Sequence, residues 1–71
     1  MRQEHTARRP CWRCRFCGGP WPCAAAREGL MAELDKVSLA IFMWVNLEEA
    51  APDLSTEAPA ILFERFIRWT H

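Results

Sequence analysis

The feature that most constrains this chain is the placement of its cysteines. All four lie between Cys11 and Cys23 in a sequence of 71 residues. A domain this short buries a marginal apolar core and commonly needs a metal ion or disulfides to hold its fold. Because the cysteines are local, they can stabilise the N-terminal third but cannot tie down the C-terminal half. We therefore expect a single domain, residues 1–71, with a cross-linked N-terminal arm.

The sequence shows no export or membrane signal. Its first ten residues are polar, and no apolar segment follows a basic one. The longest apolar run, Leu39 to Val45, is far shorter than the roughly 20 residues that span a bilayer. We therefore expect a cytoplasmic protein without membrane contact. Thiols stay reduced in that compartment, so clustered cysteines favour a metal site over disulfides.

Composition divides the chain into three segments. Residues 1–22 contain prolines and glycines but no apolar period, which predicts a metal-binding loop arm. Residues 23–51 are rich in helix formers and predict one bent helix or two helices, ended by Pro52. Residues 56–69 predict a C-terminal helix. The predicted fold class is all-α, with an N-terminal zinc-binding loop packed on a small bundle of two to three helices.

Capping residues refine these helices. In the two-helix version the first helix runs from about Cys23 to Leu34, and Asp35 caps the second. Ser55 is the candidate cap of the last helix. The spacing in that helix places Arg65 on its polar side. Its apolar side is predicted to consist of Leu62, Phe63, Phe66, Ile67 and Trp69.

The middle segment is apolar on nearly every side of its predicted helix. The residues responsible are Ile41, Phe42, Met43, Trp44, Val45 and Leu47. A helix of this kind is normally buried all round, and three helices of this chain cannot cover it completely. The pattern therefore predicts a protein partner or a homodimer formed through apolar helix faces.

The cysteine spacing matches a zinc site better than other cysteine chemistry. Zinc takes four thiolate or imidazole ligands in a tetrahedron, and Cys14-x-x-Cys17 followed by Gly18 suits a turn that presents two thiolates. Cys23 falls at a predicted helix start, where free N–H groups favour a thiolate. The fourth ligand is either His5 or Cys11, and the spacing does not decide between them. An iron–sulfur cluster, a redox dithiol and two disulfides are less favoured alternatives.

The run from His5 to Cys23 has the pattern HxxxRPxWxCxxCGxPWPC. In this run, and in the C-terminal Leu62 to Trp69, the chain resembles small uncharacterised actinobacterial zinc-knuckle proteins, some of them labelled flavin reductase. The resemblance covers most of the chain. It implies the ligand set His5, Cys14, Cys17 and Cys23, with Cys11 as a spare thiol. The sequence has no Gly-rich phosphate loop or βαβ unit for a reductase.

Three functions are compatible with the sequence. The favoured one is a non-enzymatic interaction or regulatory module that is stabilised by structural zinc. The second is nucleic-acid binding, because residues 1–23 carry a net charge of +4 while residues 24–71 carry −4. The basic arm places Arg8, Arg9, Arg13 and Arg15 among the aromatic residues Trp12, Phe16 and Trp21. The third is a thiol and zinc redox sensor that uses Cys11. No catalytic residues are expected.

Overall fold

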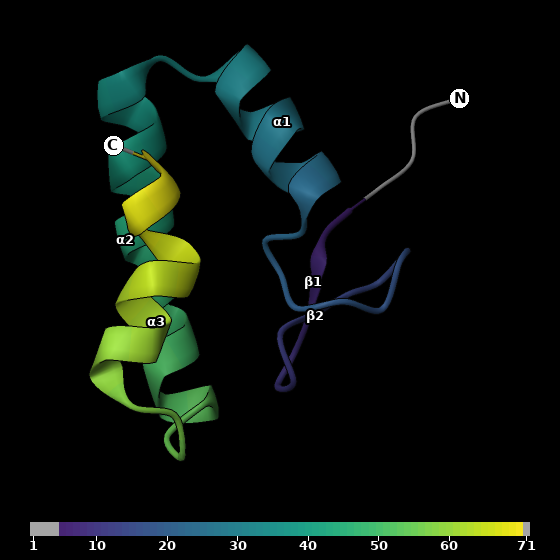
Figure 1. The fold of residues 1–71 in the computed structure, drawn as a ribbon, viewed down its shortest axis with the longest axis vertical. Coiled ribbons are helices and arrows are strands. Elements are labelled where there is room, and N and C mark those ends of the chain that lie inside the picture. Colours follow the sequence, from purple (N-terminus) through teal and green to yellow (C-terminus); the bar gives the residue numbers. More distant parts are fainter. Residues whose placement is uncertain (1–4, 71) are drawn as a thin grey trace.

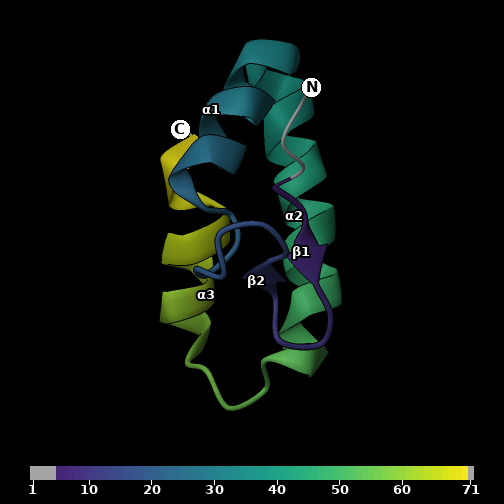
Figure 2. The same ribbon diagram turned by 90° about the vertical axis from the view of Figure 1, so that its right-hand side faces the viewer.

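The computed structural model describes residues 5–70. Its elements in chain order are β1 (Ala7–Arg8), β2 (Arg13–Cys14), α1 (Ala24–Glu33), α2 (Lys36–Asp53), α3 (Pro59–Phe66) and the 3₁₀ turn η1 (Arg68–Thr70). Helices α2 and α3 lie side by side as a hairpin, and the strands and α1 lie over one side of it (Figures 1 and 2). The protein is mostly helical, as predicted, but it is not strictly all-α.

The unpredicted element is a small antiparallel sheet in the segment expected to be a loop. Ala7 pairs with Cys14 and Arg8 with Arg13, and a single further bridge joins Arg13 to Pro20. Trp12, in the turn between the strands, has a left-handed backbone with φ of 56°. Strands of two residues have too few positions for an alternating apolar pattern, so periodicity could not reveal them. We call residues 5–23, which contain this sheet, the ribbon.

The middle segment forms two helices, α1 and α2, that meet at a sharp break. Cys23 and Leu34 stand at the two cap positions of α1, at the ends expected for that helix. Asp35 caps α2, and its carboxylate accepts a hydrogen bond of 3.1 Å from the backbone N–H of Ser38. The cap supplies an acceptor for an otherwise unpaired N–H of the first turn, which explains why the chain restarts a helix there.

The turn between α2 and α3 differs from expectation in two details. Pro52 does not end α2 but lies inside its last turn, and the Leu54 N–H still reaches the Ala50 carbonyl at 2.8 Å. A proline so near the C-terminus removes only one helical hydrogen bond, which the helix tolerates. The cap residue of α3 is Ala58 rather than Ser55, with Pro59 in the first turn. The last helix is therefore shorter than the predicted residues 56–69, and the 3₁₀ turn η1 follows it.

The core lies where the ribbon meets the helical hairpin. Trp12 and Trp21 of the ribbon pack around Phe66 of α3, with ring centroids 5.7 and 6.1 Å from that of Phe66. Both indoles are buried, as is Phe66. The remaining buried apolar residues are Ala26, Leu39, Met43, Ala50, Leu62 and Ile67. The ribbon thus contributes the two largest side chains of the core.

The face of α2 that points away from this core is apolar and exposed. Its exposed large residues are Val37, Ile41, Phe42, Trp44 and Val45. Phe63 of α3 adjoins them, with its ring 6.2 Å from that of Trp44. Despite this composition, no helix within residues 5–70 combines the length and hydropathy needed to cross a bilayer.

Candidate metal centre

Four side chains of the ribbon that could bind a metal lie close together. One ligand atom each from His5, Cys14, Cys17 and Cys23 lies within 4.8 Å of all the others. The Nδ1 atom of His5 is 3.2 Å from the Cys14 sulfur and 3.3 Å from the Cys23 sulfur. The four residues are separated by up to 18 positions, so the ribbon fold itself brings them together.

Each donor is positioned by a different part of the ribbon. His5 precedes β1, and Cys14 ends β2, directly across the sheet from Ala7. Cys17 follows in a turn that continues through Gly18, whose φ of 78° is the positive angle expected for a glycine after the second cysteine. Cys23 occupies the N-cap of α1, which is the helix start that the sequence predicted. Figure 2 shows the ribbon turning in front of the helical hairpin toward the start of α1.

The spacing of the donor atoms fits a tetrahedral ion of zinc size. Bond lengths of about 2.3 Å to sulfur and 2.1 Å to nitrogen place neighbouring ligand atoms about 3.6 to 3.8 Å apart in a tetrahedron. The two short distances from His5 lie slightly below that range, and the 4.8 Å limit lies above it. Small side-chain rotations are enough to bring all four atoms onto one ion. Three thiolates and one imidazole are also a donor set that zinc prefers.

The surroundings of the Cys14 sulfur favour its thiolate form. It is only 3 % exposed, and burial alone raises its pKa. Backbone N–H groups of Cys17 and Phe16, with the Cys17 thiol and the His5 ring, outweigh burial and lower the pKa of Cys14 to about 6. The Cys17 N–H lies 3.4 Å from the sulfur, as expected when a cysteine knuckle turns its amides toward the first thiolate. This sulfur is therefore a ready metal ligand near neutral pH.

The pKa of Cys23 shifts in the opposite direction, upward. Burial raises its pKa, and the neighbouring thiols of Cys14 and Cys17 raise it further, against a lowering effect of the Ala26 N–H. Like charges this close cannot all ionise without a cation between them. The crowding of three thiols and an imidazole thus has an electrostatic cost that a divalent cation would relieve.

Cys11 does not join this group. It is exposed at the turn between β1 and β2, where its thiol donates a 3.4 Å hydrogen bond to the Arg8 carbonyl. Of the two fourth ligands that the spacing left open, the fold brings His5 to the other donors. A contact far along the sequence holds it there, because the Trp21 indole N–H donates to the His5 carbonyl at 3.0 Å.

Two helix residues hold the ribbon in place, and the sequence predicted this role for neither of them. Asp53, at the end of α2, accepts hydrogen bonds from the Trp12 indole at 2.8 Å and from Arg9 at 2.9 Å. Arg65 of α3 was expected on the polar side of its helix, and that prediction is wrong. Its half-buried guanidinium donates to the backbone carbonyls of Trp12 at 2.5 Å and Trp21 at 2.7 Å. Only the sequence-distant carbonyls explain this orientation, so helical periodicity gave no signal for it.

Part of the basic arm stays open to solvent beside the metal site. Arg8, Arg13 and Arg15 line one cavity of 290 Å³ together with the exposed ring of Phe16. Arg9 is different, because it pairs with Asp53 and Glu49 of α2. The buried Trp12 and Trp21 are also unavailable for stacking on an external base. The candidate nucleic-acid surface is therefore smaller than the sequence suggested.

No family model matches the chain, and no curated protein or solved structure is significantly similar to it. The resemblance to actinobacterial zinc-knuckle proteins accordingly stays a prediction. The function is therefore inferred from the geometry of the four donor residues. That geometry defines a class, a small helical protein with a Cys₃His cluster able to hold a metal ion.

Proposed function

We propose that this protein is a non-enzymatic interaction module whose ribbon is folded by one structural zinc ion. The observation that carries the proposal is the convergence of His5, Cys14, Cys17 and Cys23 within 4.8 Å. A catalytic zinc keeps a coordination position for water or substrate, whereas four protein donors fill the tetrahedron. A filled site favours a structural role over hydrolytic or Lewis-acid chemistry.

The fold explains what such an ion would contribute. Two-residue strands and a handful of backbone hydrogen bonds cannot hold residues 5–23 together alone. A structural ion supplies its binding free energy to the folded state, because the unfolded chain has no preformed site. Once fixed, the ribbon places Trp12 and Trp21 against Phe66 and so completes the core. Zinc would in this way order the helical hairpin as well as the ribbon.

An interaction role is supported by the exposed face of α2. Small monomeric proteins seldom expose a run of large apolar side chains, and contiguous patches of this kind are typical of protein interfaces. Figure 1 shows the ribbon and α1 on one side of the helical hairpin, and this packing leaves Ile41, Trp44 and Val45 of α2 exposed. None of the four candidate ligands belongs to this face, so the metal site can stabilise the face without taking part in binding.

The zinc proposal is tested by native mass spectrometry of protein purified without chelator, compared with its denatured mass. We expect one zinc per chain and four reduced cysteines, and circular dichroism that collapses when a strong chelator is added. The variant Cys11→Ser should retain the metal, whereas Cys14→Ser should not. A mass increment matching iron and sulfide, or a denatured mass lower by four protons, would contradict the proposal.

A second candidate function, single-stranded nucleic-acid binding, is favoured by one observation. Arg8, Arg13 and Arg15 converge on the cavity beside Phe16, and Phe16 is 57 % exposed. Guanidinium groups pair with phosphates, and an exposed aromatic ring stacks on a base. The cavity lies next to Cys14 and Cys17, so the arginines also offset the negative charge of a zinc–thiolate site, which weakens the case for an external anion.

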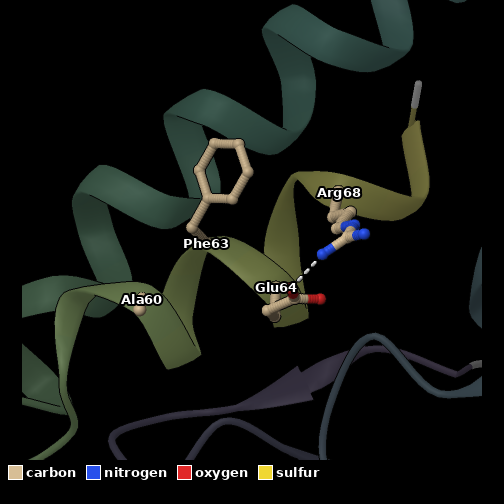
Figure 3. Close-up of a pocket in the computed structure, with 4 residues that line it drawn as sticks. All are labelled: Ala60, Phe63, Glu64 and Arg68. Carbon is tan, nitrogen blue, oxygen red and sulfur yellow. Dashed lines mark hydrogen bonds and ion pairs between the residues drawn. The ribbon is translucent and has the colours of Figure 1, made fainter.

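Fluorescence anisotropy with a labelled single-stranded RNA at low salt separates these roles. If the arm binds nucleic acid, joint replacement of Arg8, Arg13 and Arg15 by Gln abolishes binding and reduces its salt dependence. The matched control is Arg68→Gln, because Arg68 does not line the cavity and pairs with Glu64 instead (Figure 3). Absence of binding by the wild-type chain at low salt would remove this candidate.

A further inference from the structure

We propose that the indole N–H of Trp21 selects His5, rather than Cys11, as the fourth ligand of the metal centre. The inference deepens the structural zinc role proposed above and rests on it. Trp21 supplies no donor atom of its own, so we assign it as a positioning residue that acts through His5. The selection matters because a cysteine such as Cys11 is chemically able to take the same coordination position.

The hydrogen bond from Trp21 anchors the backbone of His5. The strand pairing begins at Ala7, and the Arg15 N–H extends the contact by one bond of 2.8 Å to the Thr6 carbonyl. His5 lies one residue beyond this contact, and its own carbonyl accepts from the Trp21 indole at 3.0 Å. This bond therefore fixes where the imidazole enters the donor group.

The Trp21 side chain is itself held by the core, so its N–H points in one direction. Trp21 is 5 % exposed, and its ring centroid lies 6.1 Å from that of Phe66 and 6.0 Å from that of Trp12. The Trp21 carbonyl accepts from Arg65 at 2.7 Å, and the Trp21 backbone N–H donates to the Trp12 carbonyl at 2.9 Å. A donor fixed in this way loses little freedom when it binds its acceptor, which strengthens the preference that it imposes.

The residue after Cys11 holds the competing thiol away from the other donors. Trp12 is 2 % exposed, its indole N–H donates to Asp53 at 2.8 Å, and its backbone φ is 56°. Cys11 is left exposed in the turn, although it borders the same 290 Å³ cavity as Cys14 and Cys17. A local rearrangement of the turn would bring its thiol to these two cysteines, whereas the folded turn keeps it outside the donor group.

Neither donor chemistry nor loop length explains the choice of His5. Zinc accepts thiolate and imidazole ligands alike. Cys11 is three positions from Cys14, whereas His5 is nine positions away, and the shorter loop costs less entropy to close. Position must therefore favour His5, and the bond from Trp21 supplies this preference. Loss of the donor leaves a part-buried carbonyl unpaired, and a penalty of that kind changes an equilibrium constant by about fivefold to a hundredfold.

The test uses cobalt(II) in place of zinc, because its absorption reports the number of bound thiolates. The variant Trp21→Phe keeps an aromatic ring but has no N–H. As Cys11 replaces His5, the thiolate-to-cobalt charge-transfer absorption per bound ion should rise by up to about one third, the ratio of four thiolates to three. The double variant Trp21→Phe with Cys11→Ser has no fourth thiol and should show no rise.

The matched control is Trp69→Phe. The Trp69 side chain packs against the same core, but its indole N–H is buried without a hydrogen-bond partner among the described residues. This variant loses the same atoms as Trp21→Phe without losing a hydrogen bond, so its cobalt spectrum should match that of the wild type. An unchanged spectrum in Trp21→Phe, or an equal rise in both variants, would overturn the proposal.

Alkylation of the zinc-loaded chain gives an independent measure of the same selection. In the wild type, iodoacetamide should react rapidly with a single thiol, that of Cys11, because the other three cysteines bind the ion. In Trp21→Phe this reaction should slow as Cys11 becomes a ligand, and mass spectrometry follows its rate. An equal rate in the two chains would count against the selection of His5 by Trp21.

A second replacement of Trp21 covers the case in which Trp21→Phe does not fold. A synthetic chain with benzothienylalanine at this position keeps the size and shape of the indole but has no N–H. A wild-type chain that binds no metal would contradict the proposed function. A wild-type chain that binds one ion, with the same spectrum after the benzothienylalanine replacement, would overturn only the selection by Trp21.

Discussion

The ribbon and the helical hairpin are stabilised by different kinds of interaction. In the ribbon, residues 5–23, four polar donors converge on one point and the strands are only two residues long. In the hairpin, α2 and α3 bury Leu39, Met43 and Phe66 but leave a second apolar side on α2 uncovered. The ribbon has too little apolar contact to fold alone, and the hairpin has more apolar surface than its own chain covers. We therefore propose an ion for the first and a partner for the second.

The two regions depend on each other through a small shared interface. Its apolar part is the packing of Trp12 and Trp21 around Phe66. Its polar part consists of the hydrogen bonds that Asp53 and Arg65 make to the ribbon. If the account is right, loss of the metal should damage the hairpin through this interface, and loss of the interface should weaken both regions in graded steps.

The largest effect should come from removing the metal. Structural zinc in small peptides contributes an apparent 10–16 kcal/mol, comparable to or above the whole stability of a small domain. Chelation, or Cys14→Ser, should therefore unfold the chain and shift the tryptophan emission to the red as Trp12 and Trp21 become exposed. Cys11→Ser is the matched control and should leave the emission spectrum unchanged. Retention of helical circular dichroism and buried tryptophan emission after chelation would show that the hairpin does not need the ribbon.

The next largest effect should follow from Phe66→Ala, because this ring joins the two regions. Truncating a fully buried phenylalanine costs about 3–5 kcal/mol through lost burial and the cavity that remains. Urea denaturation of the zinc-loaded protein measures this loss. Phe16→Ala, which truncates an exposed ring of the same kind, is the control and should cost far less. Equal losses in the two variants would contradict the idea that the core lies at the junction.

A smaller loss is expected from Arg65→Met, which keeps much of the side-chain length but removes its donors. The Trp12 and Trp21 carbonyls would each lose a hydrogen bond, at a combined cost of about 1–3 kcal/mol. Arg68→Met removes an exposed ion pair from the same helix and should have an effect below about 1 kcal/mol. If Arg65→Met were no worse than Arg68→Met, the guanidinium would not be a link between the regions.

The smallest effect should be that of Asp53→Asn, and it should depend on pH. The Trp12 indole N–H, followed by Arg9, lowers the pKa of Asp53 in the folded chain. A lowered folded pKa stabilises the protein fully above the unfolded value of about 3.9, and this contribution disappears as the pH falls through the folded pKa. The difference in urea midpoint between zinc-loaded wild type and zinc-loaded Asp53→Asn should thus be constant from about pH 7 to pH 5, because this whole window lies above the unfolded pKa of the carboxyl group. A difference that grows on acidification would contradict the assignment.

Local signals in the sequence predicted the helices and most of the donor cluster. The break at Asp35 and the helix start at Cys23 follow from capping, which depends on the nearest few residues. The positive φ of Gly18 follows from its place after Cys17. These features need no knowledge of distant contacts, so sequence spacing was sufficient for them.

Features set by distant contacts could not be predicted. The inward turn of Arg65 depends on carbonyls more than 40 positions away, and the gathering of His5 depends on the Trp21 indole. The spacing alone therefore left His5 and Cys11 as equal candidates for the fourth ligand. The two-residue strands could not be predicted because they carry no periodic pattern. The left-handed backbone of Trp12 could not be predicted because it depends on the burial of this side chain against Phe66, which offsets an unfavourable φ.

The most direct test of the central claim is X-ray absorption at the zinc edge of the purified protein. A site formed by His5, Cys14, Cys17 and Cys23 predicts three sulfur neighbours at about 2.3 Å and one nitrogen neighbour at about 2.0–2.1 Å. The signal should be the same in Cys11→Ser. Four sulfur neighbours in the wild type, falling to three in Cys11→Ser, would mean that Cys11 rather than His5 completes the site and would contradict the account.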